Sequence, residues 1–83
     1  MNLKLSLVRE QFDSLISGTA SRERVSDWAR SIREADDRDE VQLSSDEDGD
    51  RIWKAVLFLE GVDLKDSPET YLHNEADIQR ERP

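Results

Sequence analysis

The chain has 83 residues, with 20 Asp or Glu and 12 Lys or Arg, so its formal charge at pH 7 is -8. A chain of this size is expected to form one helical domain, residues 1–83, whose small core leaves little room for a deep catalytic cleft. It contains no cysteine, which excludes disulfides and thiolate metal sites.

The first half of the chain predicts two amphipathic helices. Residues 5–16 carry apolar side chains at helical intervals, and Gly18 is a favourable helix C-terminus. Ser21 is placed to cap a second helix, residues 21–35, by accepting a hydrogen bond from an amide of its first turn. The apolar stripe of that helix consists of Val25, Trp28, Ala29 and Ile32. We therefore expect both helices, Trp28 included, to bury one face in a shared core.

Residues 34–50 account for the whole net charge. They hold nine Asp or Glu against the single base Arg38, while the other 66 residues hold 11 acids and 11 bases. Aspartate and serine disfavour helix interiors because their short polar side chains compete for backbone hydrogen bonds. The sequence therefore predicts a long, mostly irregular acidic connection, residues 36–49, in which residues 41–43 can form a brief extended stretch.

A third helix is predicted from about residue 50 to Gly61. Its residues 52–59 are apolar apart from Lys54, and they include Trp53. Such a helix must be covered on several sides, so we place it at the centre of the fold.

The last part of the chain predicts a break and a short helix. Pro68 interrupts regular structure because it lacks an amide donor. Asn74 is placed to cap a final helix held by Ile78, which we expect to fray at about residues 80–83. The predicted fold is all-α: a compact bundle of three to four short helices with a long acidic loop between the second and third.

Two binding motifs are suggested by the sequence, and each lacks a feature that its function requires. Residues 44–50 resemble a calcium loop, but with Gly49 at its sixth position the first and last ligands fall on Ser44 and Ala55, which are not carboxylates. The first two helices resemble a helix-turn-helix with four arginines toward DNA, although an acidic chain repels polyanions. These arginines are Arg22, Arg24, Arg30 and Arg33. We therefore expect neither a metal nor a nucleic-acid partner.

No catalytic residues are predicted. His73 is the only histidine, and the chain has no cysteine nucleophile. Acid–base catalysis needs two carboxylates in distinct, partly desolvated settings, whereas those of an acidic loop are alike and solvated. We therefore expect a protein that is not an enzyme and needs no cofactor.

Several short motifs carry a resemblance to a known group of proteins. They are Ser21-Arg22-Glu23, Val25-Ser26-Asp27-Trp28-Ala29, Ile52-Trp53 with Ala55, Leu59, Gly61, Asp63 and Leu64, then Tyr71-Leu72-His73 and Asp77-Ile78. Through them, residues 6–80 resemble the small all-helical bacterial immunity proteins of contact-dependent growth inhibition and related polymorphic toxin systems. The resemblance implies an inhibitor that blocks a cognate toxin domain, often a nuclease with a basic cleft, inside the cell that makes it.

The acidic segment suits such a role, because carboxylates can shield a cationic surface on a partner protein. We therefore expect a non-enzymatic inhibitor of a basic partner protein, a cognate toxin domain. The residues expected to contact it are Asp36, Asp37, Asp39, Glu40, Asp46, Glu47, Asp48, Asp50, Tyr71 and His73.

One alternative stays open, namely a small helical regulatory or adaptor module whose acidic loop is only a solubilising connector. The N-terminus lacks the apolar run of a secretory signal, and no stretch approaches the roughly 18 apolar residues of a membrane span. In either case we expect a cytoplasmic protein that does not bind membranes and is a monomer or a weak dimer.

Overall fold

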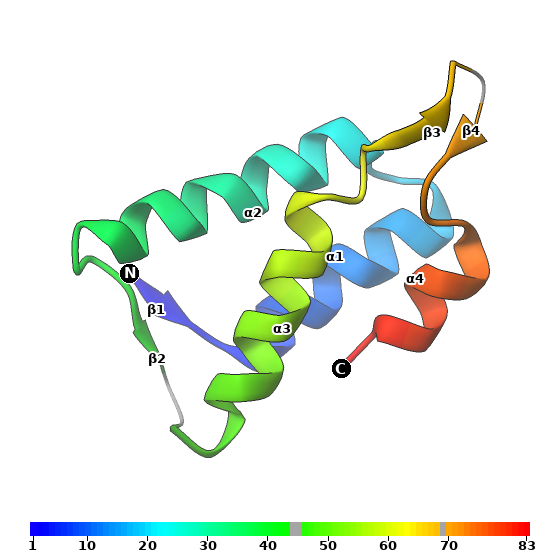
Figure 1. Ribbon diagram of the computed structural model, residues 1–83. Coiled ribbons are helices and arrows are strands. Elements are labelled where there is room, and N and C mark those ends of the chain that lie inside the picture. Colours follow the sequence, from blue (N-terminus) through cyan, green and yellow to red (C-terminus); the bar gives the residue numbers. More distant parts are fainter. Residues whose placement is uncertain (44–45, 69) are drawn as a thin grey trace.

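The computed structural model describes residues 1–43, 46–68 and 70–83. Within these ranges the chain forms helices α1 (Leu5–Ser17), α2 (Arg22–Asp37), α3 (Gly49–Glu60) and α4 (Glu75–Glu81), together with short strands (Figure 1). The predicted all-α bundle is confirmed. No helix in the described ranges is long and apolar enough to cross a membrane.

The helix ends follow the capping residues that the sequence predicts. Gly18 has a φ of 78°, and its amide bonds to a carbonyl of the last turn of α1. Ser21 accepts a hydrogen bond from the Arg24 amide at 3.1 Å. Asn74 and Asp77 form a capping box, in which each side chain accepts from the other's backbone amide. Local hydrogen bonds therefore fix where α1 ends and where α2 and α4 begin.

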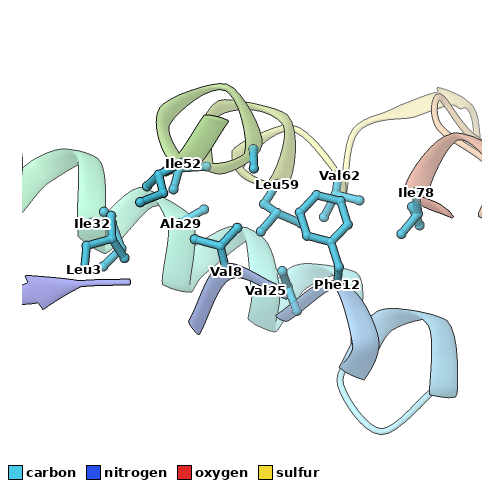
Figure 2. Packing of buried hydrophobic residues seen from close by; sticks show 12 residues of the cluster. Leu3, Val8, Phe12, Val25, Ala29, Ile32, Ile52, Leu59, Val62 and Ile78 are labelled. Atoms are coloured by element: carbon cyan, nitrogen blue, oxygen red, sulfur yellow. The ribbon is translucent and has the colours of Figure 1, made fainter. Parts of the chain in front are cut away.

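The core is one cluster of apolar side chains to which α1 to α4 all contribute (Figure 2). Figure 2 shows it running from Leu3 and Ile32 at one end to Val62 and Ile78 at the other. Its members are Leu3, Val8, Phe12, Val25, Ala29, Ile32, Ile52, Ala55, Val56, Leu59, Val62 and Ile78. Trp28 and Trp53 are only partly buried and pack against this cluster, so they cover the core instead of filling it.

Two pairs of short strands accompany the helices, and of these the sequence indicated only the extended stretch at residues 41–43. β1 (Asn2–Leu3) pairs in parallel with β2 (Gln42–Leu43), and β3 (Lys65–Ser67) pairs antiparallel with β4 (Thr70–Tyr71). Strands of two or three residues are too short to show a periodicity of two. The first pair joins the N-terminus to the segment after α2, and the second forms a hairpin between α3 and α4 (Figure 1).

The long acidic loop is not confirmed. α2 continues through Asp37, β2 follows at residues 42–43, and a 3-10 turn, η1 (Asp46–Asp48), leads directly into α3. The reason is apolar anchoring, since Val41 and Leu43 both pack against the core. A Cβ placed on Gly49 would lie 3.1 Å from a Leu43 methyl, so this segment is held closely against the start of α3. The two serines of the candidate calcium loop, residues 44–45, lie outside the described residues.

Candidate functional site

The predicted partner-binding carboxylates lie on several elements instead of one loop. Asp36 and Asp37 are exposed in the last turn of α2. Asp39 follows with a positive φ of 57°, and Glu40 accepts a hydrogen bond from Arg38 at 2.8 Å. These carboxylates are exposed, but two belong to the end of α2 and two to the segment that follows it.

The remaining carboxylates of the prediction lie around the start of α3. Glu47 and Asp48 belong to η1, and the side chain of Asp46 lies outside the described part of the chain. Asp48 is 3.6 Å from Arg51, and Asp50 is exposed in the first turn of α3, where a carboxylate complements the helix dipole. Contact of any of these acidic side chains with a partner stays a prediction.

Tyr71 and His73, the other predicted contacts, are tied into the fold beside the β3–β4 hairpin. The Arg22 guanidinium lies 4.2 Å from the centroid of the Tyr71 ring, and the Tyr71 hydroxyl donates to Glu23 at 2.9 Å. Hydrogen bonds from its own amide and from Tyr71 hold the pKa of Glu23 below its usual range. The His73 ring packs against Phe58 at 4.7 Å between centroids. Both side chains therefore help to position the hairpin, and a role in partner contact stays a prediction.

The four arginines of the helix-turn-helix interpretation do not form one basic face. Arg22 donates to the backbone carbonyls of Val62 and His73, which lie outside α2. The Nε of Arg33 donates to both carboxylate oxygens of Glu60, at 2.8 and 2.9 Å, and Arg30 pairs with a carboxylate one turn before it. Arg24 is exposed. Two of the four therefore hold other elements in place and are poorly placed to face DNA.

A pocket lined mainly by basic side chains lies between α3 and α4. Its volume is about 200 Å³, and it is lined by Arg51, Lys54, Ala55, Arg80, Glu81, Arg82 and Pro83. α3 supplies two bases one turn apart on its exposed side, while its other side is buried in the core. The end of α4 and the residue after it supply the other two. Four cationic side chains and one carboxylate thus converge on one recess, which we call the α3–α4 pocket.

The arginines of the α3–α4 pocket each have a carboxylate beside them. Arg51 is paired with Asp48 at 3.6 Å, and Arg80 with Asp77 at 2.7 Å. Hydrogen bonding to the Asn74 amide, together with Arg80, holds the pKa of Asp77 below its usual range. The side chains of Arg51 and Arg80 remain 53% and 69% exposed, so another anion can reach them. Ion pairs this exposed are weak and exchange readily.

Helix α1 contacts the two C-terminal residues that line the pocket, Arg82 and Pro83. Arg82 donates through Nε and Nη2 to the two carboxylate oxygens of Asp13, at 2.8 and 3.2 Å. Arg9, one turn earlier on α1, donates to the Pro83 carbonyl at 2.7 Å. We call these four residues the α1 clamp. The hydrogen bond to Arg82 lowers the pKa of Asp13, and the same contact raises the pKa of Arg82.

The α3–α4 pocket was missed because its residues are scattered along the sequence. Arg51 and Lys54 are separated from Arg80 and Arg82 by the hairpin and most of α4. No local spacing links the two pairs, and the net charge of -8 conceals them. The only available signal was that Arg51 and Lys54, three residues apart, are the two bases of the third predicted helix.

Comparison with known proteins identifies related sequences. A family described as "YxzC DNA-binding protein" matches residues 2–81. The chain is also 46% identical over 65 residues to an uncharacterized protein YxzC of Bacillus subtilis (strain 168). That alignment covers 78% of this chain and 48% of the relative, so the chain spans about half the length of this curated protein. No solved structure matches.

These matches overturn the functional predictions made from the sequence. The matching family is not one of immunity proteins, so both the resemblance to toxin-immunity systems and the toxin-inhibitor role are wrong. The expectation of a toxin partner and the exclusion of nucleic acid are wrong as well, because the family description names DNA. Nucleic acid was excluded because of the net charge of the chain. A binding partner responds instead to the local electrostatic potential of the surface that it meets.

Proposed function

Because this chain belongs to the YxzC DNA-binding protein family, we propose that it is a small regulatory helical module that binds DNA through the α3–α4 pocket. In this proposal it acts without catalysis, and it works in the cytoplasm, where it has access to DNA. A small helical regulatory module was the alternative to a toxin inhibitor in the sequence analysis.

The observation that carries the proposal is the convergence of four cationic side chains on one recess. Contacts from arginine and lysine to backbone phosphates supply most of the affinity of proteins for DNA. An arginine guanidinium also presents its donors as a planar fork that matches a phosphate. Arg51, Arg80 and Arg82 bring such forks to one opening, and Lys54 adds a more compact charge. The pocket therefore has the donors that a phosphate backbone requires.

The acidity of the chain shapes this binding without preventing it. At physiological ionic strength the field of an exposed charge is screened within about 8 Å, so distant carboxylates oppose DNA only weakly. Carboxylates beside the pocket arginines matter more, because a phosphate must compete with them. We therefore expect weak, salt-sensitive binding in one orientation, with the acidic residues 34–40 turned away from the DNA.

The dependence of DNA affinity on salt concentration tests how many bases contact phosphates. If all four bases contact phosphates, the logarithm of the association constant should fall with the logarithm of salt concentration at a slope of about -3 to -4. The measurement is fluorescence anisotropy with a labelled 20-base-pair duplex of mixed sequence, titrated from about 25 to 150 mM NaCl, the range over which such contacts are lost.

A matched pair of variants tests the location. Arg51→Ala combined with Lys54→Ala removes two bases from the pocket, and Arg24→Ala combined with Arg30→Ala removes two from the exposed side of α2. The pocket variant should bind at least about tenfold more weakly than the α2 variant, because each lost phosphate contact reduces affinity. Equal weakening would mean that only net charge matters and would reject this interface. Absence of duplex binding by the unmodified protein at the lowest salt would reject the function.

A further inference from the structure

We propose that Asp13 is an autoinhibitory counter-charge, which occupies Arg82 in the free protein and must release it when a DNA phosphate enters the α3–α4 pocket. The inference rests on the proposed function and goes further, because it assigns to α1 a regulatory contact that sets the affinity of the pocket.

The geometry places carboxylate and phosphate in competition for the same donors. Asp13 takes the Nε and Nη2 protons of Arg82, which form the forked edge that a phosphate also prefers. Arg82 lines the pocket, so the carboxylate holds one of its four cations. A phosphate that binds the same edge of Arg82 must therefore displace Asp13. The free energy of that displacement weakens binding.

The contact can open without unfolding the protein around it. The side chains of Asp13 and Arg82 are 57% and 39% exposed, so water can replace either partner. The second half of the α1 clamp, Arg9 to the Pro83 carbonyl, does not depend on the carboxylate. Ile78, which is 3% exposed, separately anchors α4 in the core. Asp13 is therefore available as a switchable contact, with the position of α4 held by other groups.

The test replaces Asp13 with asparagine, which keeps the shape of the side chain and removes its charge. Asp27→Asn is the matched control, because it removes one equal charge from an ion pair on the exposed side of α2, at 3.3 Å from Arg30. Asp13→Asn should bind duplex DNA about threefold to tenfold more tightly than the unmodified protein, with a salt slope steeper by about one. Asp27→Asn should change affinity by less than about twofold, because its charge is distant and screened.

A double variant assigns the gain to Arg82. In protein that carries Arg82→Ala, adding Asp13→Asn should no longer tighten DNA binding, because the donor that it would release is absent. A gain that persists without Arg82 would overturn the proposal in favour of general charge repulsion. If the unmodified protein binds DNA and Asp13→Asn does not bind more tightly, the autoinhibitory role is rejected while the DNA-binding function stands. If none of these proteins binds DNA, both are rejected.

A measurement on the unmodified protein covers the case in which Asp13→Asn folds poorly. The Arg82 Nε–H resonance should shift when duplex DNA is added, because its acceptor changes from carboxylate to phosphate. The corresponding resonance of Arg33, which is paired with Glu60 away from the pocket, should stay in place. Binding without a shift at Arg82 would overturn the proposal.

Discussion

Helix α4 should detach from the rest of the fold when Ile78 is replaced with alanine. Ile78 is the buried residue of this seven-residue helix and is 3% exposed. Removing a buried isoleucine side chain down to alanine typically costs about 2 to 5 kcal/mol. Helix α4 has little other apolar contact to lose, and a seven-residue helix is not stable alone. We therefore expect local undocking of α4 before α1, α2 and α3 unfold.

Amide hydrogen exchange distinguishes local undocking of α4 from destabilisation of the whole fold. In Ile78→Ala, the amides of residues 77–81 should exchange at least about 30-fold faster, which corresponds to about 2 kcal/mol, while the amides of α2 and α3 keep their protection. DNA binding should weaken with α4, since α4 positions Arg80 and Arg82 at the pocket. Leu72→Ala, at a side chain that is 52% exposed, is the control and should change neither property. Uniform loss of protection across all helices would refute the idea that α4 is a separately docked element.

Three further predictions concern the scaffold. Ser26→Ala should lower the free energy of unfolding by about 1 to 3 kcal/mol in urea titrations, because the fully buried Ser26 hydroxyl donates to the Glu60 carbonyl at 2.6 Å. Gly18→Ala should cost about 1 kcal/mol in the same assay, from backbone strain alone, because a Cβ there meets no atom within 4 Å. Asp77, whose pKa is lowered mainly by the Asn74 amide, should stabilise the fold above about pH 4 and lose this effect as pH falls through its lower folded pKa. The stability difference between unmodified protein and Asp77→Asn should therefore shrink as the pH falls below about 4, and a constant difference would contradict it.

The helices could be predicted from the sequence because their signals are local. The apolar intervals of residues 5–16 and 21–35, and the caps at Gly18, Ser21 and Asn74, act within one or two turns of backbone. The strand pairs could not be predicted, because each is two or three residues long and β1 meets a partner about 40 residues away. In the acidic connection the alternation of Val41 and Leu43 with polar residues indicated a brief extended stretch, which the structure has as β2. The length of α2 and the turn η1 were not predicted, because the many acidic residues favoured an irregular loop.

What the sequence determined by itself was the helical class, most helix boundaries and the concentration of negative charge in residues 34–50. Only the tertiary structure brought Arg51 and Lys54 of α3 next to Arg80 and Arg82, and joined Arg82 to Asp13 of α1. The physical reason is that propensity and capping act between near neighbours in the chain, whereas electrostatic potential depends on distance in space and is screened within about 8 Å. A sum of charges over the sequence therefore describes the net repulsion of a polyanion by the whole chain, and the docking of α4 decides where basic side chains gather.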